Sequence, residues 1–237
     1  MSGKVGAGGE GIFGTNRVVL LPGLHGSAAL FAPFIAAAPT WARPQAAAYP
    51  PDGPYDYDAA EVTARAVLPD DRPFVLVAES FSGPVALRIA ADPPQGLRAV
   101  VLVASFARSP LPVSLGRVPD AAFSLLPMRS AIPRWFLGGS RREAGFDRLL
   151  RETLHGVSRD TFVARLRAID EVDVRHLLPD IRLPVVYLQA TADRLIAPAF
   201  GRELIACAAT GRLARVRGAH MLLQTAPEAC WRAVLTG

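Results

Sequence analysis

Three polar residues with complementary chemistry, Ser80, Asp193 and His220, each follow shortly after an apolar run of the chain. A serine hydroxyl can attack a carbonyl carbon, a histidine can accept the serine proton and return it to the leaving group, and a carboxylate can orient the histidine. Along the chain they stand in the order nucleophile, acid, base. This combination of types and order predicts a serine-based acyl-transfer site.

Ser80 stands between a short apolar strand and a helix-forming stretch, in the segment Ala78-Glu79-Ser80-Phe81-Ser82-Gly83. A sharp strand-to-helix turn raises a serine hydroxyl above a parallel sheet, and it requires small residues two positions on either side of the serine. Those positions usually hold glycine, and here they hold Ala78 and Ser82. The alternative interpretation is a serine that only caps the following helix.

Asp193 and His220 are the predicted partners of Ser80. Asp193 follows the apolar run at 184–190 and could accept the Nδ1 proton of a histidine, although an aspartate there could equally belong to an Asx turn. His220 follows the last predicted strand, where a capping or core histidine is the alternative. The other histidines do not combine a position after a strand with the required chain order: His25, His155 and His176.

The turn after the first predicted strand reads Pro22-Gly23-Leu24-His25-Gly26. Acyl transfer needs N–H donors aimed at the developing oxyanion, and one donor normally comes from a turn after an early strand. We assign the two donors to the backbone amides of Leu24 and Phe81; the alternative is a glycine-rich turn without a catalytic role. His25 and Met221, which adjoin these segments, are candidates for lining the pocket.

The elements that must position these residues alternate between short apolar runs and longer amphipathic segments, which predicts an α/β fold with a mostly parallel, doubly wound sheet. The predicted strands are 17–21, 46–49, 74–78, 98–104, 184–190 and 213–217, and the predicted helices are 28–37, 59–68, 84–91, 198–208 and 227–235. We expect residues 17–104 and 180–237 to form the core. We expect residues 105–179 to form a helical insertion, called the cap below, after the strand that ends near Ala104, and residues 1–16 to form a flexible glycine-rich leader.

Composition narrows the classes of function. The chain has 237 residues, 51% of them hydrophobic, which is enough for one buried core. No run approaches the ~20 apolar residues that a membrane span requires. The net charge is +5, but the arginines are dispersed and no nucleic-acid-binding motif occurs, so we expect no nucleic-acid partner. No cysteine and histidine spacing suggests a metal, and no cofactor is predicted. The two cysteines, Cys207 and Cys230, favour buried thiols in a reducing, cytoplasmic location; a structural disulfide is the alternative.

Four segments carry a resemblance to a known family. They are Val-Val-Leu-Leu-Pro-Gly-Leu, Leu-Val-Ala-Glu-Ser-Phe-Ser-Gly, Ala-Asp-Arg-Leu-Ile-Ala-Pro and Gly-Ala-His-Met-Leu-Leu-Gln-Thr-Ala-Pro-Glu. Through them the chain resembles the α/β-hydrolase superfamily from about Arg17 to the C-terminus. The resemblance implies a Ser80–His220–Asp193 triad and a lid after Ala104. The chain departs from the family pattern where the usual His-Gly pair reads Pro22-Gly23, at both elbow glycines, and in lacking the first two strands.

The function expected from these residues is hydrolysis of a small-molecule carboxylic ester or thioester through an acyl-enzyme. Arginines and apolar residues mix in the predicted cap, which would suit docking of an acidic acyl carrier protein or coenzyme A; the alternative is solvated faces of amphipathic helices. Within the fold, a lyase, cyclase or isomerase remains an alternative, and so does a non-catalytic ligand-binding protein. We expect a monomer or a homodimer.

Overall fold

The computed structural model describes residues 13–53, 55–70, 72–112, 114 and 144–235. Its centre is a six-stranded sheet in the order β2-β1-β3-β4-β5-β6, and every neighbouring pair is parallel. The strands are β1 (Arg17–Leu21), β2 (Arg43–Ala46), β3 (Phe74–Glu79), β4 (Leu97–Val103), β5 (Val185–Ala190) and β6 (Gly211–Val216). The predicted parallel α/β sheet is therefore confirmed.

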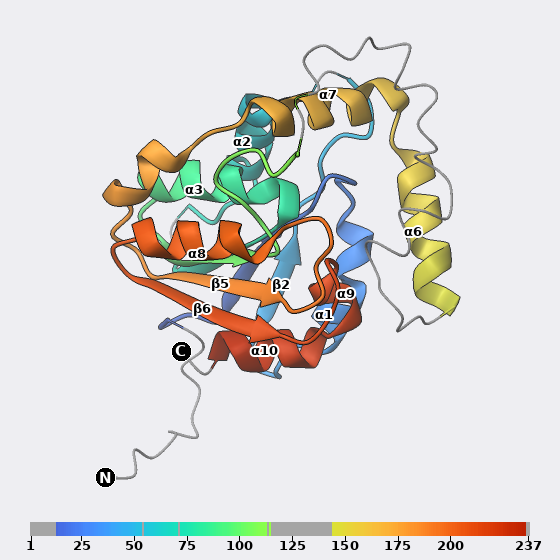
Figure 1. Cartoon of the computed structure of the whole chain (residues 1–237). Coiled ribbons are helices and arrows are strands. Elements are labelled where there is room, and N and C mark those ends of the chain that lie inside the picture. Colours follow the sequence, from blue (N-terminus) through green and yellow to red (C-terminus); the bar gives the residue numbers. More distant parts are fainter. Residues whose placement is uncertain (1–12, 54, 71, 113, 115–143, 236–237) are drawn as a thin grey trace.

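Helices cover both faces of the sheet (Figure 1). One face packs against α2 (Tyr57–Arg65), α3 (Gly83–Ala91) and α8 (Pro198–Cys207), and the other against α1 (Ala32–Ala36) and α10 (Pro227–Leu235). Short 3₁₀ helices precede α1 (Ala28–Phe31) and α3 (Ser80–Ser82), and the short α9 (Leu222–Thr225) precedes α10. This layering is that of a doubly wound α/β fold.

Burial explains why the central strands read as continuous apolar runs. All six residues of β3 and of β5 are buried, because helices cover both of their faces. Alternate residues of the central strands enter two separate clusters, so that Leu76 packs with α2 and α3 while Val75 and Val77 pack with α1 and α10. The core is consequently divided into two apolar layers by the sheet itself.

The edge strand β2 lies three residues earlier than the predicted 46–49. Its sequence, Arg-Pro-Gln-Ala, alternates between exposed and half-buried positions and contains no apolar run, because it pairs only with β1. Ala47 and Tyr49 are buried in the loop after the strand, which explains why that stretch looked like a strand. At the other end of the chain, α9 was not predicted, because four residues are too few for a helical period.

Residues 13–16, which the sequence placed in the leader, are packed on the core. Thr15 is buried and its hydroxyl donates to the carbonyl oxygen of Pro73 (2.6 Å), and Arg43 N–H donates to the carbonyl oxygen of Asn16 (2.7 Å). Residues 1–12 lie outside the described residues.

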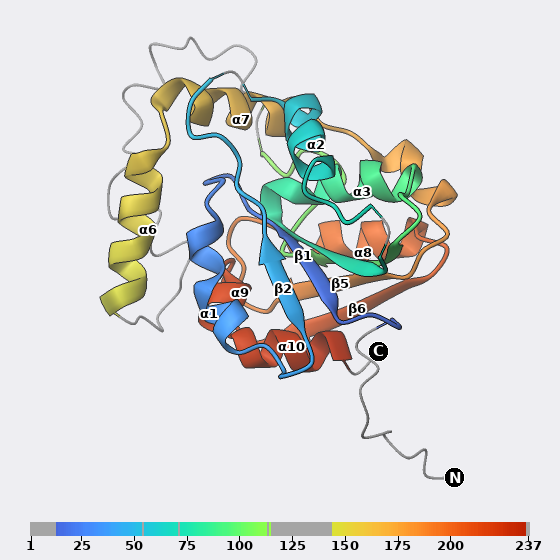
Figure 2. The ribbon, with the colours of Figure 1, turned by 180° about the vertical axis from the view of Figure 1, so that it is seen from behind.

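Between β4 and β5 the structure describes α6 (Ala144–Gly156), α7 (Arg159–Glu171) and a 3₁₀ helix, Arg175–Asp180, where the sequence predicts the cap. Figures 1 and 2 show α7 beside α2 and over one edge of the sheet, with α6 standing at its side. Residues 115–143, with the predicted cap arginines Arg129, Arg134, Arg141 and Arg142, lie outside the described residues. Among the helices that are described, none has the length and apolar character needed to cross a membrane.

Candidate active site

Ser80 occupies the strained turn predicted for a nucleophile. It follows β3 directly and has a φ of 49°, a left-handed conformation that residues other than glycine rarely adopt. The Ser105 hydroxyl donates to the Ser80 carbonyl oxygen (2.6 Å) and so secures this turn. A Cβ atom on Gly83 would lie 1.7 Å from that hydroxyl oxygen, so the helix can start here only with glycine. Ser80 itself is half-buried.

The structure brings Ser80, His220 and Asp193 together from turns after three different strands. His220 Nε2 lies 2.9 Å from Ser80 Oγ, and His220 Nδ1 lies 2.9 Å from Asp193 Oδ2. The side chains of His220 and Asp193 are 5% and 3% exposed, so their contact is shielded from water. Because the carboxyl ends of parallel strands meet at one edge, residues far apart in the chain converge there.

Asp193 satisfies both interpretations of the sequence. Its Oδ1 accepts hydrogen bonds from the backbone N–H groups of Leu195 (2.8 Å) and Ile196 (3.0 Å), which is the geometry of an Asx turn. Its Oδ2 is thereby directed at His220. The turn interaction orients the carboxylate for its second partner.

Ser82, one of the two residues that replace elbow glycines, connects the elbow to the segment after β1, which we call the β1 turn (residues 22–26). Its hydroxyl donates to the Pro22 carbonyl oxygen (2.5 Å) and accepts from the Tyr49 hydroxyl (2.6 Å). Burial raises the pKa of Tyr49, so its phenol stays protonated and remains a donor. The sequence interpretation counted only the small size of Ser82 and missed this bridge.

The residue before Ser80 belongs to a buried polar cluster. Glu79 is 2% exposed, and its Oε2 accepts from Gln224 Nε2 (3.2 Å) and lies 3.6 Å from His25 Nε2. His25 Nδ1 accepts from the N–H of Ser27 (3.0 Å), which leaves Nε2 as the protonated nitrogen of a neutral ring. A carboxylate in the otherwise apolar β3 was the one signal that could have revealed this cluster. It connects the β1 turn, the elbow and α9.

The other predicted site residues lie around this centre. Leu24 is half-buried in the β1 turn, and Phe81 is fully buried with its ring stacked on that of Tyr57 (4.7 Å between centroids). Met221 is buried against Leu30 and Leu150, where α6 meets the core. The donor roles of Leu24 and Phe81, and the pocket roles of His25 and Met221, stay predictions.

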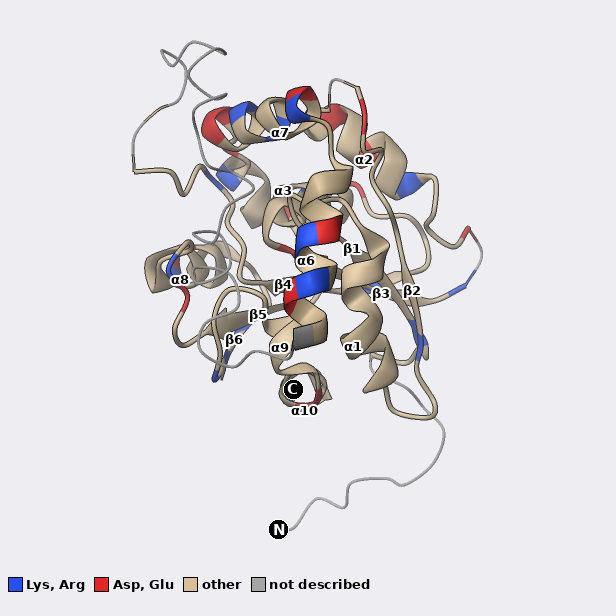
Figure 3. Cartoon of the chain, turned by 90° about the vertical axis from the view of Figure 1, so that its right-hand side faces the viewer, with Lys and Arg blue, Asp and Glu red and all other residues tan. Residues whose placement is uncertain are grey.

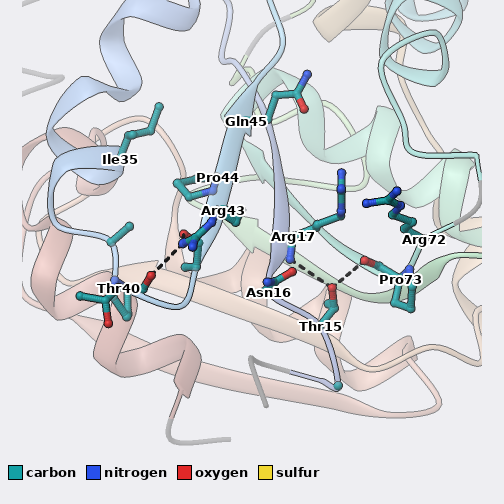
Figure 4. Close-up of a pocket in the computed structure, with 14 residues that line it drawn as sticks. Thr15, Asn16, Arg17, Ile35, Thr40, Arg43, Pro44, Gln45, Arg72 and Pro73 are labelled. Atoms are coloured by element: carbon teal, nitrogen blue, oxygen red, sulfur yellow. Dashed lines mark hydrogen bonds between the residues drawn. The ribbon is translucent and has the colours of Figure 1, made fainter. Parts of the chain in front are cut away.

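A separate hollow of about 1310 Å³ lies at the other end of the sheet, where strands β1 and β2 begin (Figure 4). Its lining includes Arg17 and Arg43, the first residues of β1 and β2, together with Arg72. None of its lining residues belongs to the Ser80 site. In the part of the chain that the structure describes, no group of three or more His, Cys, Asp or Glu side chains could hold a metal ion.

Comparison with known families places this geometry in context. A model of the alpha/beta hydrolase family matches residues 18–233, nearly the whole chain. The chain belongs to the alpha/beta hydrolase family. The predicted superfamily is therefore confirmed, and the six parallel strands with flanking helices are the core of its fold.

Three similar proteins illustrate the comparison of this alpha/beta hydrolase with individual chains. The polyketide synthase ThaQ of Burkholderia thailandensis is 29% identical over 244 residues, a match that covers 92% of this chain but 12% of ThaQ. The enol-lactonase of Burkholderia xenovorans LB400 has a TM-score of 0.79 at 21% identity, covering 93% of this chain and 90% of its own. The N-formylmaleamic acid deformylase of Pseudomonas putida S16 has a TM-score of 0.74 at 18% identity, covering 92% and 91%. At these identities the structural likeness shows the fold.

Proposed function

We propose that this protein is a serine hydrolase that cleaves a carboxylic ester or thioester through an acyl-enzyme. The observation that carries the proposal is the continuous hydrogen-bonded chain from Ser80 Oγ through His220 to Asp193, with both links at 2.9 Å. The left-handed backbone at Ser80 supports it independently, because such strain persists where the surrounding structure enforces it for a function.

In the proposed mechanism, His220 Nε2 accepts the Ser80 proton while Oγ attacks the carbonyl carbon of the substrate. Asp193 accepts the Nδ1 hydrogen bond, holds the ring in the tautomer with Nε2 free, and stabilises the imidazolium that forms. The amides of Leu24 and Phe81 donate to the oxyanion. His220 then protonates the leaving alcohol or thiol, and a water activated by the same ring releases the acyl group.

A thioester on an acyl carrier is the substrate class that we favour. Support comes from the similarity to a protein named a polyketide synthase. The described helices of the predicted cap add no support, because arginines and acidic residues are equally numerous along α6 and α7 (Figure 3). A higher kcat/KM for a carrier-bound acyl group than for the same group on a short pantetheine thiol would support a carrier; equal values would indicate a small-molecule substrate.

The function is tested by labelling Ser80 with a fluorophosphonate probe. We expect the wild-type protein to become labelled and to hydrolyse p-nitrophenyl acyl esters or acyl thioesters. Ser80→Ala should lose labelling completely and lose all but background hydrolysis, because it removes the attacking oxygen. Melting temperatures of the two proteins provide the fold control, since the only hydrogen bond described for Ser80 Oγ among the described residues is that with His220.

The alternatives predict different outcomes of the same experiment. A lyase, cyclase or isomerase of this fold would label at Ser80 without releasing acid from any ester or thioester. A non-catalytic ligand-binding protein would neither label nor hydrolyse while remaining folded, and that result would refute the proposal. The two cysteines, Cys207 and Cys230, are free thiols, in keeping with our proposal of a cytoplasmic location.

A further inference from the structure

Arg165, on α7, is a fully buried guanidinium that has no carboxylate partner among the described residues. It is 0% exposed, and among the described residues it forms no ion pair. Burying an unpaired cation is expensive, so such a residue is retained only where its hydrogen bonds serve the structure or the function strongly. Burial lowers the pKa of Arg165, but a guanidinium stays charged at neutral pH.

The guanidinium joins two loops that follow neighbouring strands. Nη1 donates to the carbonyl oxygen of Leu24 (2.8 Å), in the β1 turn, and Nη2 donates to that of Pro50 (2.7 Å), after β2. Its carbon lies 4.8 Å from the ring centroid of Tyr55 and 5.8 Å from that of Tyr49, whose faces partly replace the lost water. The planar fork of arginine suits such a bridge, whereas lysine could reach only one carbonyl.

The β1 turn is shaped to admit this side chain. Gly26 has a φ of +72°, and a Cβ atom there would lie 2.7 Å from Arg165 Nη1. The loop after β2 also holds the start of α7 through two further bonds, in which Thr161 Oγ1 donates to the Gly53 carbonyl oxygen (2.7 Å) and the Ser158 N–H donates to that of Pro51 (2.9 Å). Figure 2 shows α7 lying beside the segment that connects β2 to α2.

Arg165 completes a set of three consecutive restrained carbonyl groups. The carbonyl of Pro22 accepts from Ser82, that of Gly23 accepts from the N–H of Gly26 (2.9 Å), and that of Leu24 accepts from Arg165. The Leu24 N–H belongs to the same peptide plane as the Gly23 carbonyl. Its direction is therefore determined by bonds on both sides of that plane.

We propose that Arg165 is a positioning residue for the oxyanion hole, through which the docking of α7 orients the Leu24 amide. The inference rests on the proposed function, because it assigns Leu24 as an oxyanion donor. A preorganised donor stabilises the transition state more than the bound substrate, so its misalignment lowers kcat more than it raises KM. Arg165 touches no reacting atom in this scheme and acts only through the β1 turn.

The test compares Arg165→Met, Arg165→Lys and the wild type in ester hydrolysis and in inhibition by a boronic acid that forms a tetrahedral adduct on Ser80. For Arg165→Met we expect kcat to fall about 100-fold, as for the loss of one oxyanion donor, with KM changed less than about threefold. Boronate affinity should fall in parallel with kcat/KM. Arg165→Lys should recover part of the lost kcat and part of the lost boronate affinity. Arg151→Met, at an exposed position of α6, is the matched control and should keep wild-type values of both.

Outcomes separate the inference from the proposed function. If the wild type neither labels nor hydrolyses, the proposed function fails before Arg165 is assessed. If the wild type is active and folded Arg165→Met and Arg165→Lys keep wild-type kcat and boronate affinity, the positioning role is refuted. If Arg165→Met does not fold, Arg165→Lys decides alone: a lowered kcat at unchanged KM and melting temperature supports the role, and unchanged kcat overturns it.

Discussion

At the scale of single residues, the candidate site depends on side chains that each satisfy two partners. Asp193 binds two backbone amides with one oxygen and His220 with the other, and Ser82 both donates to Pro22 and accepts from Tyr49. Such double use fixes a side chain without a large packing surface. It also means that an isosteric replacement can preserve the fold while changing the chemistry.

Asp193→Asn should separate these two uses. The amide oxygen would keep accepting from Leu195 and Ile196, which leaves the NH₂ group facing His220 Nδ1. The ring would then be held in the tautomer that carries its proton on Nε2, toward Ser80, where it cannot act as a base.

We expect kcat to fall by about 10³- to 10⁴-fold for Asp193→Asn. Its melting temperature should stay close to that of the wild type because the turn is kept. Steady-state hydrolysis and thermal unfolding measure the two effects. Hydrolysis within tenfold of the wild-type rate would mean that Asp193 does not orient His220.

At the scale of elements, close approach of α8 to β5 depends on one glycine. A Cβ atom on Gly201 would lie 2.4 Å from the ring of Tyr187. That ring cannot move aside readily, because the Tyr187 hydroxyl donates to the Ser105 carbonyl oxygen (2.8 Å) and accepts from its N–H (3.1 Å). Ser105 in turn secures the Ser80 turn, so this contact connects α8 to the elbow.

Gly201→Ala should therefore lower the free energy of unfolding by about 1–3 kcal/mol, the usual cost of overpacking. Gly145→Ala is the matched control, since Gly145 also lies in a helix and a Cβ atom there meets nothing within 4 Å. The control should be neutral or stabilise by at most about 1 kcal/mol, through helix propensity alone. Urea denaturation compares them, and equal stability of the two variants would contradict the tight packing of α8.

At the scale of the whole molecule, the sheet and its helices bury one cysteine and expose the other. Cys230 is fully buried, and burial raises the pKa of its thiol to about 12, whereas Cys207 is exposed at the end of α8. Alkylation requires both access and the thiolate form. Only Cys207 meets the access requirement in the folded chain.

Iodoacetamide at pH 8 should therefore modify one thiol of the native protein and a second only in denaturant. Mass spectrometry of the digested protein would locate the modified residue, and Cys207→Ser should leave the native protein unmodified. Rapid native labelling of Cys230 would show that α10 does not stay packed on the sheet.

The sequence was sufficient to predict those features that depend on short stretches of neighbouring residues. The apolar run and small residues around Ser80 determined a buried strand followed by a sharp turn, and the chain order of Ser80, Asp193 and His220 predicted their roles. The predicted bounds of β1 and α10 agree with the structure because apolar periodicity and flanking prolines mark them. The edge strand β2 was misplaced because half of it faces solvent, which removes that signal.

Only the tertiary structure decided which distant groups meet. Nothing near Arg165 in the chain indicates that it reaches the Leu24 carbonyl 141 residues away, or that Glu79 faces both His25 and Gln224. Parallel strands have their carboxyl ends on one side of the sheet. Helices that pack over these ends place side chains there that are far apart in the sequence. The chain by itself therefore determined which residues could do chemistry, and the packing of its layers determined which residues hold them in place.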